Sequence, residues 1–175
     1  MNLESFERNI PVNKELLHLS KQVGELLISK GHSIGIAESS SGGLVSAHLL
    51  AVPGASKYFL GGSVIYTRFA QRGFLNVIDS EMDGLRAATE EYASLNAAKV
   101  KDLLGATWGL AETGATGPTG NRYGDAAGHS CIAVSGPSNV SVTLETGSSD
   151  REENMISFSK EALTLLLRTL SENLD

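Results

Sequence analysis

Helical stretches alternate along this chain with short apolar runs that are typical of buried β-strands. Leu16, Leu19 and Val23 recur at the spacing of one helix face, whereas residues 33–37 form a compact run of the strand type. The expected helices cover residues 16–30, 44–50, 89–104 and 151–170, with a helical turn at 55–59, and the expected strands cover residues 33–37, 62–67, 108–111, 130–135 and 140–145. Helices interleaved with about five strands predict an α/β fold, a single three-layer domain with helices packed on a central mixed sheet.

The chain has 175 residues, which gives room for one domain with a full core. We expect this domain over residues 13–172, preceded by an N-terminal extension at residues 1–12. Residues 1–9 carry charged side chains and no apolar segment, so we expect no secretory signal. The longest apolar runs are far too short to span a membrane.

Charge and cysteine usage narrow the classes of partner. A net charge of -6 removes the usual electrostatic reason to expect a nucleic acid. The single cysteine, Cys131, excludes a disulfide framework and a multi-cysteine zinc site, and it fits a reducing compartment. The histidines show no metal-ligand spacing. We therefore expect a cytoplasmic protein that binds no metal, membrane or nucleic acid.

Clustered glycines indicate loops in which main-chain amides can approach a ligand. The clusters that follow strand-like runs lie at residues 42–43 and within residues 114–128. A strand, a Ser/Gly-rich loop at residues 38–43 and a helix form the layout of an anion site, because amides at a helix start can hold a phosphate or carboxylate. The loop matches neither the Walker nor the dinucleotide-binding pattern, and its serines can equally well cap the helix.

Several motifs of the chain resemble, in order and spacing, those of the CinA C-terminal domain family, the nicotinamide-nucleotide amidases. They are AESSSGG at 37–43, VPGAS at 52–56 with Phe59, GSVIY at 62–66, TGATGP at 113–118 and SDR at 149–151. The resemblance extends over residues 16–170, nearly the whole chain. It implies that residues 13–172 form a CinA C-terminal-like domain.

The family's reaction is the hydrolysis of the carboxamide of nicotinamide mononucleotide to nicotinate mononucleotide and ammonia. By position, the resemblance implies that Ser56 is the nucleophile, that Tyr66 lies close to it and that Thr113 contributes to the catalytic site. The implied substrate-binding residues are Glu38, Ser39, Ser41, Gly42, Gly43, Gly114, Gly117 and Arg151. The resemblance implies a small-molecule nucleotide as the ligand and no cofactor. We also expect the chain to form a homo-oligomer.

The chain departs from the family pattern where that pattern places its lysine. Gln71 occupies this position among the predicted catalytic residues, and Arg68 replaces a family asparagine. A serine hydroxyl is a weak nucleophile without a base, and glutamine cannot accept the proton. Loss of a general base typically removes roughly 10²–10⁴ in rate.

Three hypotheses about function therefore remain open. The chain is an amidase on a nicotinamide nucleotide, or a catalytically weak or silent homologue that binds a nucleotide, or an enzyme of other specificity that uses another base. His129, at the end of the glycine-rich loop, is the candidate for that base, although a strand-edge histidine with a satisfied ring is the favoured interpretation of this residue. In all three, we expect the loops at 39–43 and 113–118 to face one shared cleft.

Overall fold

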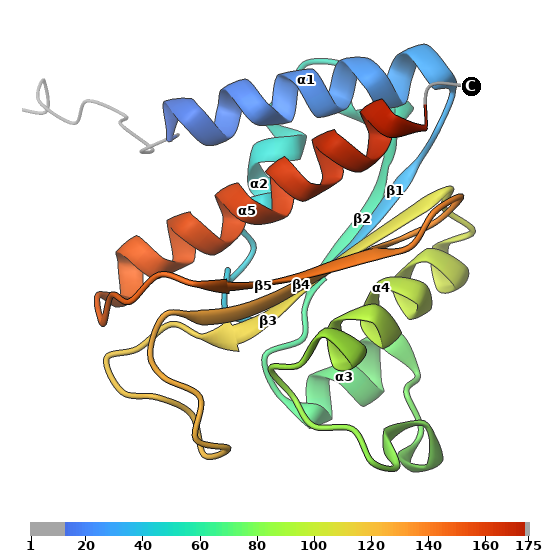
Figure 1. Ribbon diagram of the computed structural model, residues 1–175. Coiled ribbons are helices and arrows are strands. Elements are labelled where there is room, and N and C mark those ends of the chain that lie inside the picture. Colours follow the sequence, from blue (N-terminus) through green and yellow to red (C-terminus); the bar gives the residue numbers. More distant parts are fainter. Residues whose placement is uncertain (1–12, 174–175) are drawn as a thin grey trace, which may run out of the picture.

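The computed structural model describes residues 13–173, and the predicted extension at residues 1–12 lies outside them. Within the described residues, one mixed sheet has the order β2-β1-β3-β4-β5 (Figure 1). The strands are β1 (Ile34–Glu38), β2 (Phe59–Val64), β3 (Trp108–Ala115), β4 (His129–Ser135) and β5 (Val140–Glu145). β1 pairs in parallel with β2 and β3, while β4 pairs antiparallel with β3 and β5. The carboxyl ends of β1, β2 and β3 therefore meet at one edge of the sheet.

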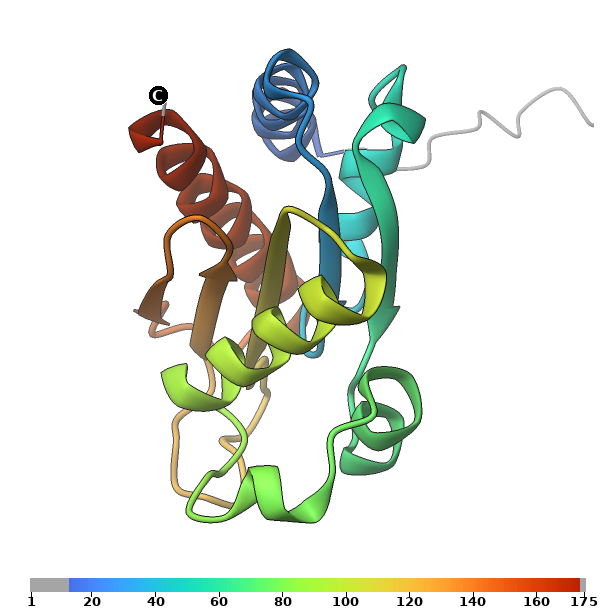
Figure 2. The same cartoon turned by 90° about the vertical axis from the view of Figure 1, so that its right-hand side faces the viewer.

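Helices cover both faces of the sheet, so the predicted three-layer α/β architecture is confirmed (Figures 1 and 2). One layer contains α1 (Lys14–Lys30), α2 (Leu44–Leu50) and α5 (Arg151–Glu172), and the other contains α4 (Glu90–Leu104) with α3 (Arg68–Leu75) beside it. Two short 3-10 helices, η1 (Ala55–Lys57) and η2 (Asp79–Met82), lie in the connections. Among residues 13–173, no helix has both the length and the apolar character required to cross a membrane.

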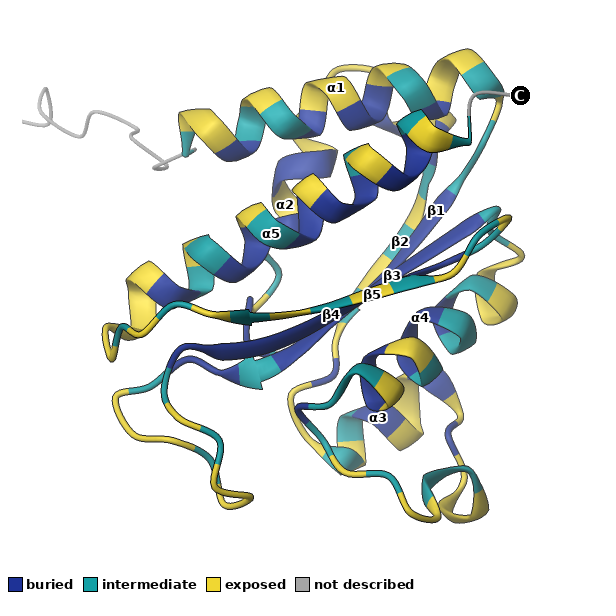
Figure 3. Ribbon diagram, in the orientation of Figure 1, coloured by how far each residue is buried: buried dark blue, intermediate teal, exposed yellow. Residues whose placement is uncertain are grey.

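The burial of each strand follows from its place in the sheet (Figure 3). β1 and β4 lie inside the sheet and are buried at every residue, whereas the edge strands β2 and β5 alternate between half-buried and exposed. Trp108 and Tyr58 anchor the core under α1 and α5. On the other face, α4 approaches β3 so closely that a side chain at Gly109 would meet the Ala97 carbonyl oxygen at 2.0 Å.

β3 extends to Ala115, four residues beyond its expected end at 111, and β2 and α3 also differ from the expectation. β2 begins at Phe59, three residues before the predicted start at Gly62, because Phe59 and Gly61 also pair with β1. The helix α3 was not expected, because its eight residues include Gly73 and two exposed aromatic side chains, so no apolar stripe marks it. The Thr67 hydroxyl caps this helix by accepting a hydrogen bond from the Ala70 amide at 3.1 Å.

Candidate functional site

A cleft lies at the edge of the sheet where β1, β2 and β3 end. It consists of a cavity of about 600 Å³ and an adjoining one of about 220 Å³, which share Tyr66, Gly114 and Asn121 in their linings. The loop after β1 contributes Ser39 and Ser40, and the segment from the end of β3 contributes residues 113–117. The two predicted loops thus meet at one cleft, although the rest of the first loop does not line it.

The first loop is closed around the carboxylate of Glu38. This buried side chain accepts hydrogen bonds from the Ser41 hydroxyl at 2.8 Å, the Gly43 and Val45 amides at 3.0 Å, and the amide and hydroxyl of Ser46 at 2.9 and 2.7 Å. The amides at the start of α2 are therefore already satisfied from within the chain. The predicted anion site on this helix start is wrong, and Glu38, Ser41 and Gly43 have a structural role there.

A second buried carboxylate, Glu112 on β3, fixes the same loop from the other side. It accepts hydrogen bonds from the amides of Ser39 and Ser41 at 3.2 and 2.8 Å and from the hydroxyls of Ser40 and Ser130. Burial raises the pKa of the Glu112 carboxyl, against the opposing effect of these hydrogen bonds. Sequence reasoning missed Glu112, although an acid inside an otherwise apolar strand was the available signal.

Ser39 lines the cleft, and its side chain is not used to hold the loop. Its amide is held by Glu112, but its hydroxyl forms no hydrogen bond within residues 13–173, and the residue lines the larger cavity with Tyr66 and Thr113. Thr113 is fixed by the Ala88 amide, which donates to its hydroxyl at 3.2 Å. The structure thus brings together three of the predicted site residues, with a serine hydroxyl among them that is free to meet a ligand.

Arg151 and the glycine-rich loop form the smaller end of the cleft. The Arg151 guanidinium donates to the Gly117 carbonyl oxygen at 2.9 Å and to the Tyr66 hydroxyl at 3.5 Å. Gly117 has φ +105°, and a side chain there would meet the Ser149 carbonyl oxygen at 2.6 Å, so the loop can approach the start of α5 only with glycine. Gly114, Gly117 and Arg151, three of the predicted substrate-binding residues, all line this end.

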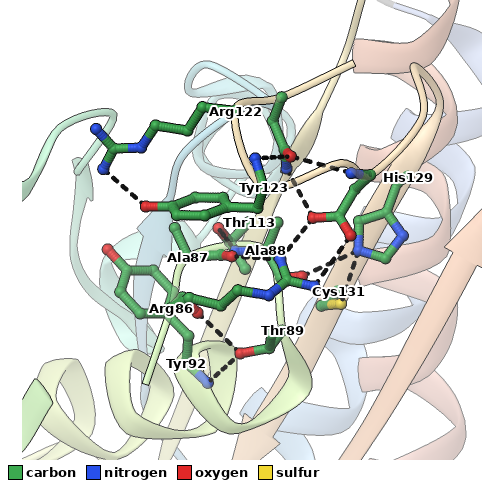
Figure 4. A network of polar contacts seen from close by, with 12 residues as sticks. Arg86, Ala87, Ala88, Thr89, Tyr92, Thr113, Arg122, Tyr123, His129 and Cys131 are labelled. Atoms are coloured by element: carbon green, nitrogen blue, oxygen red, sulfur yellow. Dashed lines mark hydrogen bonds and ion pairs between the residues drawn. The ribbon is translucent and has the colours of Figure 1, made fainter. Parts of the chain in front are cut away.

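A network of arginine, tyrosine and aspartate side chains borders the larger cavity (Figure 4). Arg86 pairs with Asp125 at 2.6 Å, and its guanidinium lies 5.4 Å from the centre of the Tyr123 ring. The Arg122 guanidinium lies 4.9 Å from the same ring and donates to the Tyr123 hydroxyl at 2.7 Å. These contacts join the glycine-rich loop to the segment before α4, so they place Tyr123 and Arg122 in the lining of the larger cavity.

Comparison with known proteins identifies the family of this chain. The sequence profile of the CinA C-terminal domain matches residues 16–170. The chain belongs to the CinA C-terminal domain family. Curated relatives include a CinA-like protein of Desulforapulum autotrophicum, 36% identical over 126 residues, and one of Nostoc sp., 38% identical over 119 residues. These matches cover 72% and 68% of this chain, but only 30% and 28% of the relatives' own length.

Solved structures support the same family assignment. A competence or damage-inducible protein from Enterobacter asburiae is 26% identical, with a TM-score of 0.82 over 89% of this chain and 98% of that one. A CinA superfamily protein from Klebsiella pneumoniae shares the fold, with a TM-score of 0.83 over 90% of this chain and 98% of that chain at 24% identity.

Ser56 of this CinA-family domain does not lie at the cleft. It is exposed on η1, which precedes β2, whereas Tyr66 follows the other end of that strand. The parallel register of β2 on β1 separates them by the strand's length, about 17 Å. The prediction that Ser56 is a nucleophile beside Tyr66 is wrong, because Ser56 precedes β2 at its amino end, whereas Tyr66 follows the carboxyl end of that strand.

Gln71 is buried on α3 and lies behind the cleft lining rather than in it. Its amide nitrogen donates to Asn96 Oδ1 at 2.5 Å, and its Oε1 accepts a hydrogen bond from the guanidinium of Arg68. Arg68 does line the cleft. In this CinA-family domain, the side chain in the lysine's position therefore holds an arginine in place.

His129 is not available as a relocated base. Nε2 lies 3.0 Å from the Ala88 carbonyl oxygen and Nδ1 lies 2.5 Å from the Glu145 carboxylate, and both of these oxygens can only accept. The ring is therefore best satisfied as the imidazolium, and it does not line the cleft. Burial lowers the pKa of His129, but the hydrogen bonds to Glu145 and Ala88 raise it more, so the pKa lies above its ordinary value.

The unfolding free energy is expected to depend on pH through His129. A raised pKa in the folded state stabilises the domain fully below the unfolded pKa, and this stabilisation is lost as pH rises through the folded value. Because Glu145 is exposed, we expect a loss of only about 0.5–1 kcal/mol. Urea titrations from pH 5.5 to 8.5 measure it, and Glu145→Gln should flatten the dependence. An equally steep dependence in that variant would contradict the assignment.

Proposed function

We propose that the cleft binds nicotinamide mononucleotide and hydrolyses its carboxamide with water, which gives nicotinate mononucleotide and ammonia. The observation that carries this proposal is the hydroxyl of Ser39, which has no hydrogen-bond partner within residues 13–173 and lines one cavity with Tyr66 and Thr113. Membership of the CinA C-terminal domain family supports the choice of reaction. Ser39, rather than Ser56, then supplies the oxygen that attacks the amide carbon.

The lining of the cleft supports a pyridine nucleotide as the ligand. Tyr66, Tyr92 and Tyr123 offer ring faces and edges against which a pyridine ring can pack. Arg151 at the glycine-rich end offers a charged, planar donor of the kind that binds phosphate. A cavity of about 600 Å³ is within the size range of small-molecule sites.

A second candidate function is that of a nucleotide-binding domain with little or no catalysis. The observation that favours it is Gln71, which is buried in the lysine's position and engaged with Arg68 and Asn96. Attack by Ser39 requires a group that accepts the hydroxyl proton, and glutamine cannot do so. The two candidates share the ligand and differ only in the rate of ammonia release.

Two substitutions together are expected to raise this rate. Gln71→Lys alone adds an ammonium beside the Arg68 guanidinium, and repulsion disfavours its placement. With Arg68→Asn as well, the repulsion is removed, and burial lowers the pKa of the new lysine so that it can accept a proton. We expect the double variant to release ammonia from nicotinamide mononucleotide about 10²-fold faster than the wild type.

The matched control is Gln71→Lys with Arg72→Asn, which removes an arginine that also contacts Asp79 but does not line the cleft. Its rate of ammonia release should stay close to that of the Gln71→Lys single variant. Nucleotide binding without ammonia release in every variant would support the second candidate over the first. Failure of the wild type to bind the nucleotide in a calorimetric titration would contradict both.

We also propose that the domain acts in the cytoplasm and as a homo-oligomer. The use of a single cysteine, Cys131, which is free and buried, supports the first, since disulfide frameworks belong to oxidising compartments. The exposed apolar side chains of Phe74, Leu103 and Leu104, which lie together near the edge strand β2, support the second. Light scattering of the full chain tests the oligomeric state.

A further inference from the structure

The charge of the cleft is opposite to that of the chain. The net charge of the chain is -6, yet Arg68, Arg122 and Arg151 line the two adjoining cavities. Among the described residues, no aspartate or glutamate contributes to either lining. Arg122 and Arg151 form no ion pair within residues 13–173. A basic cleft in an acidic chain selects an anionic ligand.

The arginines lie at two ends of the cleft. Arg151 belongs to the smaller cavity with the glycine-rich loop, whereas Arg68 and Arg122 belong to the larger one with the aromatic side chains. A ligand that fills both ends therefore meets positive charge at each of them. One phosphate accounts for one end only.

Arg68 is fixed by two partners that do not themselves line the cleft. Gln71 accepts from its Nη1, Asp79 accepts from its Nη2 at 3.2 Å, and Asn96 in turn orients Gln71. A guanidinium has five N–H groups, so these two bonds leave three for a ligand. Asp79 also pairs with Arg72, so a single carboxylate is shared by two arginines and positive charge remains.

We propose that the larger end of the cleft is a carboxylate subsite, so that nicotinate mononucleotide binds more tightly than nicotinamide mononucleotide. The ring carboxylate would accept charge-assisted hydrogen bonds from Arg68, while the phosphate meets Arg151. A carboxamide offers only one neutral oxygen, and its NH₂ group donates towards a guanidinium that can only donate as well. The identity of the ligand rests on the proposed function. The preference for the acid rests on Arg68.

Calorimetric titration of the full chain with each mononucleotide tests this inference. We expect the acid to bind about tenfold more tightly than the amide to the wild type, as one charged hydrogen bond supplies. Arg68→Gln should bring the two affinities close together by weakening the acid. The matched control, Arg72→Gln, loses an exposed arginine that shares Asp79 but does not line the cleft, and it should keep the preference.

The outcomes separate this inference from the proposed function. Equal affinities in the wild type, or tighter binding of the amide, would overturn the inference and leave the proposed function standing. An acid preference that survives in Arg68→Gln would overturn the role of Arg68. Binding of neither nucleotide would overturn the proposed function itself. If Arg68→Gln does not fold, Arg68→Lys keeps the charge without the planar fork and should show an intermediate preference.

Discussion

Replacing Ser39 by alanine is expected to lower ammonia release from nicotinamide mononucleotide by about 10³-fold or more, because the attacking oxygen is lost. The measurement is best made in the Arg68→Asn, Gln71→Lys background, where the rate to be lost is larger. Ser39 donates to Glu112 through its backbone amide, which alanine retains, so the loop should keep its shape. Nucleotide affinity measured in parallel should change little.

Ser56→Ala is the matched control for this variant. Its hydroxyl is exposed at the amino end of β2, far from the cleft, so the rate should be unchanged. The opposite result, loss of activity with Ser56→Ala and none with Ser39→Ala, would show that the reaction uses a surface other than this cleft.

Replacing Glu38 by alanine is expected to lower the free energy of unfolding by about 3–5 kcal/mol. Its carboxylate is the common acceptor of three amides and two hydroxyls around the start of α2, and these donors would be left without a partner. Several of them are buried, so water cannot replace the carboxylate fully. Urea unfolding of wild type and variant at neutral pH measures the difference.

Two further variants calibrate this effect. Glu25→Ala removes an exposed carboxylate from α1 and should change stability by no more than about 0.5 kcal/mol. Glu38→Gln should have a free energy of unfolding between those of the wild type and Glu38→Ala. Its amide oxygen still accepts hydrogen bonds, but its NH₂ group faces groups that are themselves donors. A Glu38→Ala variant as stable as Glu25→Ala would contradict the structural role of this residue.

The sequence predicted the fold where periodicity and caps agree. α4 begins after Thr89 and ends at Gly105, and β4 and β5 occupy nearly their expected ranges, because those positions carry both the apolar pattern and the terminating residue. α3 was not predicted, since only Gln71 and Leu75 of its residues are buried and no apolar stripe marks the helix in the sequence. The start of β2 was misplaced because Gly61, a glycine inside a strand, indicates the end of a strand in the sequence.

The site was predictable in outline but not in its internal contacts. The two loops were expected to share a cleft, and the structure brings them together because β1 and β3 are parallel and end at one edge of the sheet. The partners of Ser39 and Ser41 could not be foreseen, since Glu112 lies 73 and 71 residues away from them in the sequence. Glycine and serine in a loop after a strand are compatible with a bound phosphate and also with hydrogen bonds to carboxylates of the same chain. In this structure the loop binds the carboxylates of Glu38 and Glu112.

The two carboxylates that hold the loop after β1 lie on strands, so the residues that shape this loop are separate from position 71 on α3. Glu38 and Glu112 fix the loop without help from α3, where the family's lysine position lies. A substitution at position 71 therefore leaves this loop in place and acts on the cleft through its contact with Arg68. Under the proposed function, a chain with this loop can lose the base at position 71 and still present the Ser39 hydroxyl to a ligand, so the loss of catalysis and the loss of binding are separate events.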